Sequence, residues 1–277
     1  PVLTPHDAKA TATTAYVFCL PLVLGYMRLW HEAIEPSSPC FTGGFGRWSP
    51  PPAESSPTAV SAWLDLRHTA CSVGCGAASN GRFRSVRIVD LWGQVAGDVQ
   101  LDSGEARVIA APPRWVGTVR SDTAGVVRCE SAVVRCETEC DEPVQTVPGH
   151  VPDTDPANGG HTDWCEPHDD VLGSDDFWSA AARALPLTRP DPRDRAVLAG
   201  MSEMGVSPGH DWSPDRHGAA VTEAIGDGVD HALTELLQRS GDGTTHGERP
   251  PADGPRDYVG RAMAALRWDR YCTSIMR

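Results

Sequence analysis

Hydrophobic residues near the N-terminus recur at the spacing of an amphipathic helix. The apolar stripe steps by four, three, four and three residues through Tyr16, Leu20, Val23, Met27 and Trp30. Ahead of the stripe, Thr4 is suited to cap a helix, Pro5 to occupy its first turn and Asp7 to close a capping box. The pattern therefore predicts one helix from about residue 4 to residue 34, with its stripe against a sheet or another helix.

From residue 61 the period changes to that of β-strands. Apolar and polar positions alternate between short turns and predict strands over 61–66, 82–92, 106–111, 116–120, 125–130 and 132–138. No helical pattern separates these segments, which favours antiparallel pairing over a parallel sheet with crossover helices. We therefore expect an α+β fold class with a mainly antiparallel β-sandwich core, an N-terminal helix and a helical C-terminal segment.

Helical signals return after a polar segment rich in Pro, Asp, Gly and His. Ser174 can cap a helix that begins with Asp175 and Asp176, and later helices are predicted over 191–204, 213–239 and 257–268. The expected organisation has four parts. These are an N-terminal helix and loop packed on the core (1–58), the β-sandwich core (59–147), a linker (148–173) and the helical C-terminal segment (174–277).

Charge and hydropathy narrow the classes of partner. The net charge is -13, and Lys9 is the only lysine, so we expect no binding to the phosphate backbone of a nucleic acid. Residues 10–27 carry no charge, but they contain Pro21 and Gly25 and are short for a membrane span, so a buried helix is favoured. No signal-peptide pattern is recognisable. We expect a cytoplasmic protein, with an exported protein whose signal has been removed as the alternative.

The nine cysteines do not form a standard metal or disulfide framework. Cys71 and Cys75, like Cys136 and Cys140, are separated by three residues, whereas the pairs of common zinc ribbons are separated by two. We therefore expect buried free thiols in a reducing compartment.

Several segments, taken in order, resemble a known family. Ala-Tyr-Val-Phe-Cys-Leu-Pro-Leu-Val stands at 15–23, Glu-Pro-Ser-Ser-Pro at 35–39, Phe-Gly at 45–46, Ser-Ala-Trp-Leu-Asp-Leu at 61–66, Gly-Arg-Phe-Arg-Ser at 81–85 and Ile-Ala-Ala-Pro-Pro-Arg-Trp at 109–115. This order resembles the bacterial domain-of-unknown-function family 1254. The resemblance implies a sandwich-like core and a small-molecule or hydrolytic role.

The chain also departs from that family. The family's Asn-, Asp- and Tyr-containing segment before the first strand is replaced by Ser-Pro-Thr-Ala-Val at 56–60, and its paired tyrosines by Phe83 and Arg84. The usual partner domain, family 1214, has no counterpart in the sequence. We therefore expect either a homo-oligomer or a partner domain supplied by another chain.

The strands carry the candidate catalytic and substrate-binding residues. Asp65 and Asp90 each lie near a tryptophan, and two carboxylates in an aromatic cleft can do acid–base chemistry or hold a cation. Strand-end aspartates also commonly bond neighbouring backbone amides, which leaves a purely structural role open. The substrate-binding candidates around them are Trp63, Arg82, Ser85, Arg87 and Trp92. The arginines can form an anion-binding strand or a solvated sheet face.

Two sets of residues suggest metal binding. His161, Cys165 and His168 have ligand types that suit zinc, although flexible polar linkers have the same composition. Two pairs of aspartates and a later acidic helix face could hold Mg²⁺ on a diphosphate, as in prenyl-diphosphate enzymes: Asp169, Asp170, Asp175, Asp176, Asp227, His231 and Glu235. The helix dipole explains the pair at the cap without any metal. No cofactor is therefore assigned, and zinc and magnesium both stay open.

The leading functional hypothesis is a small-molecule-acting protein of family 1254 type, a hydrolase acting on an anionic metabolite. One alternative is a non-catalytic binding or assembly module completed by a partner domain, and another is a metal-dependent diphosphate enzyme. The sequence contains no Gly-x-Ser-x-Gly elbow and no cysteine–histidine signature, so whether the chain is an enzyme stays open.

Overall fold

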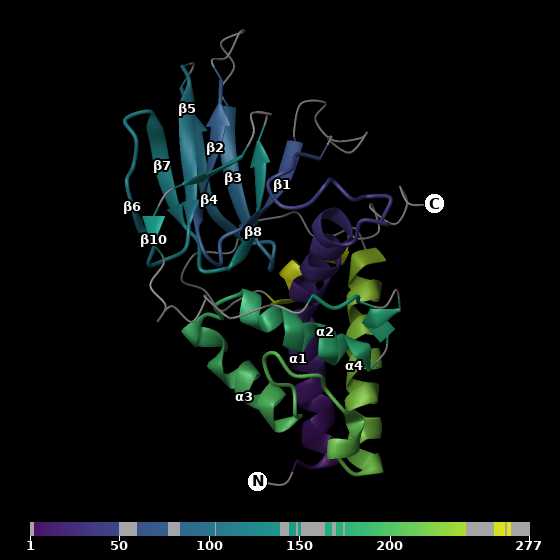
Figure 1. Cartoon of the computed structure of the whole chain (residues 1–277). Coiled ribbons are helices and arrows are strands. Elements are labelled where there is room, and N and C mark those ends of the chain that lie inside the picture. Colours follow the sequence, from purple (N-terminus) through teal and green to yellow (C-terminus); the bar gives the residue numbers. More distant parts are fainter. Residues whose placement is uncertain are drawn as a thin grey trace. The chain divides into compact units, whose positions relative to one another are not determined.

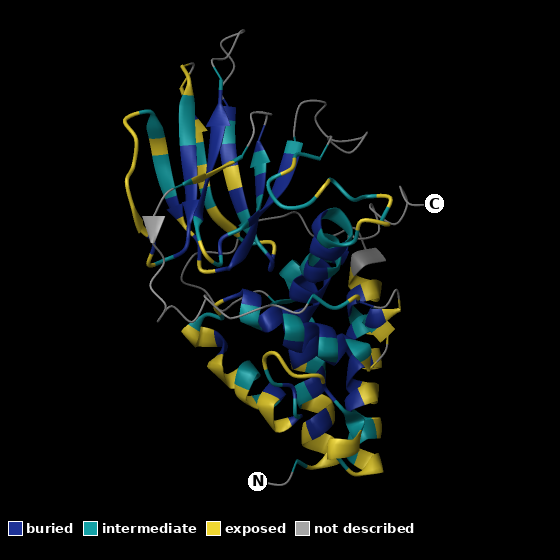
Figure 2. Cartoon of the chain, in the orientation of Figure 1, coloured by how far each residue is buried: buried dark blue, intermediate teal, exposed yellow. Residues whose placement is uncertain are grey.

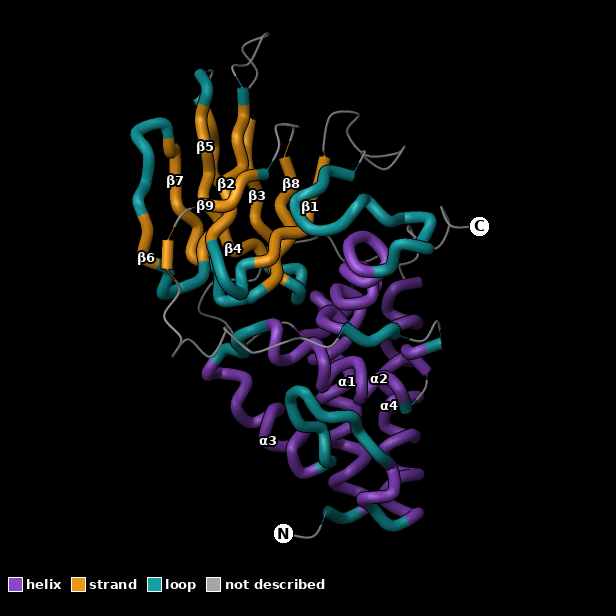
Figure 3. The backbone as a smooth tube through the Cα atoms, viewed as in Figure 1, coloured by secondary structure: helices purple, strands orange, loops and turns teal. Residues whose placement is uncertain are grey.

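The chain forms two compact units (Figures 1 and 3). The computed structural model describes residues 3–49, 60–76, 84–102, 104–138, 144–147, 149–150, 164–167, 170–173, 175–241, 258–263 and 265–266. The helical unit consists of Pro1–Met27, Cys165–Leu185 and Pro190–Arg277, and the sheet unit consists of Arg28–Trp164 and Pro186–Arg189.

The first helix, α1 (Pro5–Leu29), begins where the sequence predicts. The Thr4 hydroxyl accepts a hydrogen bond from the Asp7 amide at 3.2 Å and donates one to the Asp7 carboxylate at 2.6 Å. Tyr16, Leu20 and Val23 of the predicted stripe are fully buried. The helix continues into a π-helical turn, Trp30–Ile34. The predicted cap and apolar stripe are therefore confirmed.

Within the helical unit, residues 5–27 pack against the C-terminal helices. The Tyr16 ring stacks on Phe177 of α2 (Asp176–Ala184) with ring centroids 4.3 Å apart. Gly228 of α4 (Ala219–Gly241) faces α1 so closely that a Cβ there would lie 2.6 Å from the Lys9 carbonyl oxygen. The sequence analysis grouped this segment with the sandwich, whereas its packing places it with the helices that follow the linker.

The remaining helices are short. The helix α3 (Arg195–Glu203) is followed by Gly205 with a φ of +80°, the left-handed conformation that glycine commonly adopts just after a helix. Residues 258–263 and 265–266 are helical within the segment predicted to be the last helix. Single 3₁₀ turns lie at Val171–Gly173, Leu185–Leu187, Pro192–Asp194 and Pro214–Arg216.

The long N-terminal helix is also long and apolar enough to cross a membrane. Over Pro5–Ile34, the most apolar window is 61% buried inside the protein. A core helix and a signal sequence both meet these criteria, so this feature does not decide where the protein functions.

The sheet unit contains two four-stranded sheets. The first sheet has the order β1 (Val60–Asp65), β8 (Val133–Thr138), β3 (Arg84–Asp90) and β4 (Val95–Leu101). The second sheet has the order β7 (Thr123–Arg128), β5 (Ala106–Ala111), β2 (Ala70–Cys75) and β9 (Gln145–Val147). A two-stranded ribbon pairs β6 (Val116–Gly117) with β10 (Gly149–His150). The fold is therefore α+β with a mainly antiparallel sandwich, as the strand pattern predicted.

One apolar core lies between the sheets. The first sheet contributes Leu64, Ile88 and Val134, and the second contributes Val73 and Val108, all with no exposed surface. The strand β2 is buried along its whole length (Figure 2). Alternate residues of each strand must point away from this core, which defines an outward face on the first sheet.

Two strands, β2 and β4, were not predicted from the sequence. Residues 70–75 lie between two predicted strands but form β2. The sequence of β2, Ala-Cys-Ser-Val-Gly-Cys, is made of small residues on both faces. In β4 the apolar alternation is limited to Val99 and Leu101, beside Asp98 and Gln100, which is too short to predict a strand. The pairing of β5 with β7 is parallel, since residues 112–122 carry the chain back to the edge at which β5 began.

The cysteines differ in one respect from the expectation. Cys19, Cys71, Cys129 and Cys136 are buried free thiols, as expected. Cys75 is disulfide-bonded instead. The expectation of reduced cysteines throughout is therefore wrong at Cys75.

Candidate functional site

Three of the predicted substrate-binding residues lie on the outward face of the first sheet. Trp63 is opposite Arg135, and Arg87 is opposite both Asp98 and Glu137, on the face that does not line the core. Ser85 lies two residues from Arg87 and therefore shares that face. The Arg87 guanidinium pairs with Asp98 at 3.2 Å, and half of its side chain is exposed. This part of the face is the solvated surface that the sequence analysis gave as the plain alternative.

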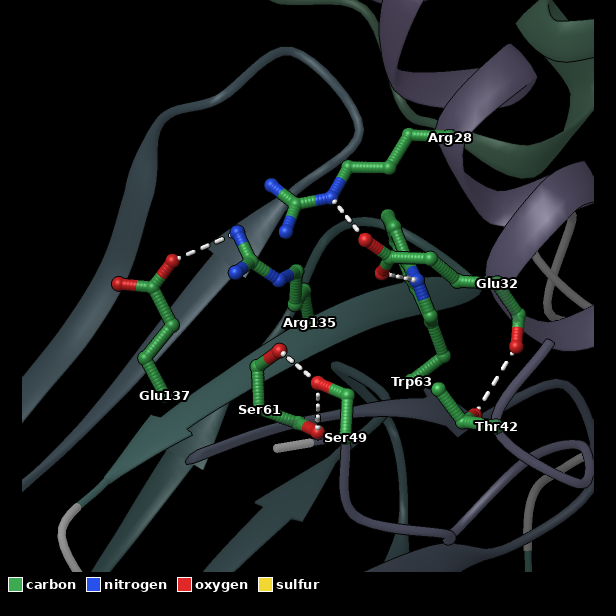
Figure 4. A network of polar contacts seen from close by, with 8 residues as sticks. All are labelled: Arg28, Glu32, Thr42, Ser49, Ser61, Trp63, Arg135 and Glu137. Atoms are coloured by element: carbon green, nitrogen blue, oxygen red, sulfur yellow. Dashed lines mark hydrogen bonds and ion pairs between the residues drawn. The ribbon is translucent and has the colours of Figure 1, made fainter. Parts of the chain in front are cut away.

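Trp63 belongs to a network around Glu32, whose carboxylate joins the end of the N-terminal helical segment to β1 (Figure 4). The Glu32 carboxylate accepts hydrogen bonds from Arg28 Nε and from Trp63 Nε1, both at 2.7 Å. The Glu32 carbonyl oxygen accepts one from the Thr42 hydroxyl at 2.9 Å. Trp63 is 3% exposed. Its indole is thus held by the protein itself and is not presented to a ligand.

The two candidate catalytic aspartates bond the backbone close to themselves. Asp65 accepts from the Arg67 amide at 3.0 Å and forms a bidentate pair with its guanidinium. Asp90 accepts from the Gln94 amide at 2.8 Å, in the turn after β3. Neighbouring residues of β8 stand opposite the two aspartates, so their side chains point to opposite sheet faces. The structure therefore does not bring Asp65 and Asp90 into one cleft.

The remaining substrate-binding and zinc-binding candidates do not lie on this sheet face among the described residues. Trp92 is 6% exposed in the turn after β3. Arg82, His161 and His168 lie outside the described residues. Cys165 is half-buried, and its backbone donates to and accepts from the Tyr26 hydroxyl, at 3.2 and 3.0 Å.

No group of three His, Cys, Asp or Glu side chains in the described part of the chain is placed to hold a metal ion. Of the residues considered for magnesium, Asp227 pairs with Lys9 at 3.2 Å, and Glu235 pairs with Arg239. Asp169 lies outside the described residues. These ion pairs give the described part of the acidic helix face a structural role.

A hollow of about 530 Å³ lies at one side of the sandwich. Its lining residues come from the loop before β1, from the end of β1 and start of β2, and from the start of β9: Phe45, Gly46, Arg47, Leu64, Asp65, His68, Thr69, Cys71, Val144 and Thr146. Both β1 and β9 are end strands of their sheets. The hollow therefore lies beside the end strands of both sheets.

The loop before β1 is fixed over the edge of that strand. The Gly46 amide donates to the Trp63 carbonyl at 2.7 Å, and the Ser49 amide donates to the Ser61 carbonyl at 2.8 Å. Gly46 has a φ of +72°, which a residue with a side chain rarely adopts. These bonds cover the exposed edge of β1 and hold the neighbouring Arg47 at the hollow.

The hollow has a polar rim and an apolar floor. Arg47, His68 and Thr146 are exposed at the rim, whereas Leu64 and Cys71 are buried beneath it. Burial, followed by the nearby Asp65 carboxylate, raises the pKa of the Cys71 thiol to about 12. The thiol therefore stays protonated at neutral pH and behaves as an apolar group.

A row of stacked groups supports the wall of the hollow. The Phe45 ring lies against Trp164 with centroids 6.0 Å apart, and the Arg67 guanidinium lies 5.1 Å from the centre of the same indole. Arg67 in turn holds Asp65. The Asp65 carboxylate thus reaches the hollow with its charge already neutralised by an arginine.

Asp65 was predicted as a site residue, whereas Arg47 and His68, which also line the hollow, were not. The glycines of residues 42–46 lack the preceding strand, the following helix and the lysine of a phosphate-binding loop, so this motif alone does not predict a site. The sequence signal for a shaped loop was a group of three glycines on both sides of Phe45. Gly43, Gly44 and Gly46 all adopt positive φ, so this loop has one defined, turn-rich path.

The comparisons with known proteins establish the fold and no more. No family model matches the chain, and no curated protein matches it either. Among solved structures, the crystal structure of the VPA0106 protein from Vibrio parahaemolyticus is similar, with a TM-score of 0.65 and 16% sequence identity over 94% of this chain. The chain spans 66% of the length of that protein.

Proposed function

We propose that the sheet unit binds a small anionic molecule in the hollow, with Arg47 as the main anion-binding group. The observation that carries the proposal concerns the partners of Arg47. In the described part of the chain its guanidinium has no ion pair and no side-chain hydrogen bond, whereas Arg67 and Arg87 are each paired with an aspartate. A guanidinium offers a planar fork of donors that fits carboxylate and phosphate oxygens. The volume of about 530 Å³ is within the range of small-molecule sites.

The neighbours of Arg47 support the same ligand charge. His68 and Thr146 add an imidazole and a hydroxyl to the rim, and both groups can donate a hydrogen bond to an anion. Asp65 contributes a carboxylate to the lining of the hollow. Its bidentate ion pair with Arg67 offsets most of the repulsion between this carboxylate and an anionic ligand. The lining is therefore favourable to one negative charge.

Binding is better supported than hydrolysis. Cys71 is protonated at neutral pH, since its pKa is raised to about 12. Among the described residues, no hydrogen bond joins His68 to Cys71 or to Asp65, so no nucleophile is paired with a base. The proposal is therefore a binding site for an anionic metabolite, and hydrolysis of that metabolite would need a group beyond these residues.

Two arginine variants test the proposal. Calorimetric titration with small carboxylates and phosphates should find a ligand whose affinity falls about tenfold in Arg47→Gln, the loss of ~1.4 kcal/mol expected for one charge-assisted bond at an exposed rim. Arg87→Gln is the matched control, because it removes an exposed arginine from the same unit. Loss of affinity in Arg87→Gln with full affinity in Arg47→Gln would place the site on the outward sheet face instead.

We also propose that the chain is of the family 1254 type. The ordered segments at 15–23, 61–66 and 109–115 support this, together with the α+β fold. The alternative, a non-catalytic module completed by a partner domain, stays a second proposal. Light scattering after size exclusion tests that alternative, since a strict monomer across a wide concentration range would count against self-assembly.

The disulfide at Cys75 is relevant to the cellular compartment in which the protein functions. A disulfide persists in oxidising compartments and is rare in the cytosol, so its presence favours export over the cytoplasmic location expected from sequence. We therefore propose an exported protein. Thiol counting on the protein isolated from its native cells under alkylating conditions tests this, and a fully reduced Cys75 would restore the cytoplasmic alternative.

A further inference from the structure

The floor of the hollow is apolar beyond what binding a small ion requires. Leu64 has no exposed surface, and Cys71 is 7% exposed. Phe45 and Val144 are half-buried beside them. An ion such as phosphate or acetate would contact the rim and leave the partly exposed apolar surface of Phe45 and Val144 facing water. A ligand with an apolar body would cover it and gain the free energy of removing both surfaces from water.

The charges around the hollow restrict the anionic group. Arg47 supplies the unpaired cation of the described lining, and Asp65 supplies a carboxylate held by Arg67. A second negative charge on the ligand would have no second unpaired arginine to meet among these residues, and it would approach Asp65. One guanidinium facing one carboxylate in bidentate geometry satisfies both partners.

We propose that the ligand is a monocarboxylate with a chain or ring of apolar carbons. Its carboxylate binds Arg47 at the rim, and its apolar body lies on Phe45, Cys71 and Val144. This inference rests on the proposed anion-binding function, and it adds the ligand class that the floor selects.

A homologous series measures the contribution of the floor. Sodium butanoate, hexanoate and octanoate are titrated into the full chain by calorimetry at pH 8, with octyl phosphate and octanamide for comparison. Each added methylene should tighten binding about fourfold until the floor is covered. Octanamide should bind at least tenfold more weakly than octanoate, and octyl phosphate, which is doubly charged at this pH, should also bind more weakly.

Two valine variants assign the effect to the floor. Val144→Thr keeps the side-chain shape but places a hydroxyl in the hollow, so it should weaken octanoate several-fold and leave butanoate nearly unchanged. Val119→Thr makes the same change at a site that is 49% exposed, and should alter neither affinity. Circular dichroism and thermal melting of both variants verify that each is folded.

The outcomes separate this inference from the proposed function. Binding that depends on Arg47 but not on chain length, or octyl phosphate that binds more tightly than octanoate, overturns the ligand class and leaves the anion site standing. Chain-length dependence that is unaffected by Arg47→Gln overturns the anion site. Failure of every compound to bind overturns both.

Discussion

Replacement of Trp63 by phenylalanine tests whether the Glu32 network joins the N-terminal segment of the sheet unit to β1. The substitution keeps an aromatic ring but removes Nε1, which donates to Glu32 at 2.7 Å. The carboxylate would keep its bond from Arg28 and lose one of its two side-chain donors. The Glu32 and Arg28 side chains are only 16% and 11% exposed, so water can replace the lost donor only in part.

The magnitude follows from that burial. A hydrogen bond to a charged group contributes ~1.5–3 kcal/mol when it is buried. With the partial exposure of Glu32 the lower part of that range applies, so the coupling between Trp63→Phe and Glu32→Ala should be ~1.5 kcal/mol in a double-mutant cycle. The exposed pair of Arg87 and Asp98 on the same sheet is the control, and its coupling should be at most ~0.5 kcal/mol.

Native-state hydrogen exchange of the amides in β8 is the assay, because it reports on the sheet unit separately from the helical unit. Urea denaturation of each variant provides the equilibrium reference. If the coupling at Trp63 and Glu32 is no larger than at the exposed control pair, the network does not stabilise this junction and the reasoning fails.

Three further predictions concern packing, pH and the disulfide. Gly228→Ala should destabilise the helical unit by at least ~1 kcal/mol, because the new Cβ would meet the Lys9 carbonyl at 2.6 Å; the melting temperature measures this, and Gly226→Ala, where nothing lies within 4 Å, is the control. Burial raises the pKa of Cys71 and Cys129 from 9.0 to about 12, so the unfolded chain loses these protons first. The free energy of unfolding should therefore be unaffected by these thiols below pH 9 and should fall between pH 9 and 12, and Cys129→Ala should flatten that fall in denaturant titrations. Cys75→Ser should lower the free energy of unfolding of the chain by ~2–4 kcal/mol in urea denaturation, whereas an unchanged midpoint would show that the disulfide contributes nothing.

The sequence predicted the helices and strands that have one buried face and one solvent-exposed face. β3 and β8 alternate clearly, and the stripe of α1 repeats at helical spacing, so burial can be deduced from each. The strand β2 has small residues on both faces, and in β4 only Val99 and Leu101 form an apolar signal, so the local pattern contains too little information for either. The partners of α1 are set by packing with α2 and α4, which no local pattern encodes.

The candidate site was predicted less well, for a related reason. Asp65 was predicted as a site residue and does line the hollow, but its expected companions Ser85 and Arg87 lie on β3 and do not line it. Arg47 and Thr146 are about a hundred residues apart in the chain and meet only because the loop before β1 pairs with Trp63 and β9 pairs with β2. Long-range pairing of this kind is not visible in the spacing of residues.

The most direct test of the central claim is a nuclear magnetic resonance titration of the isotope-labelled chain with octanoate. The account predicts shift changes at the amides around the hollow, above all at Arg47, His68 and Thr146, and none at Ser85 or Arg87. Shift changes confined to the outward face of the first sheet, with the amides of the hollow unmoved at saturation, would contradict it.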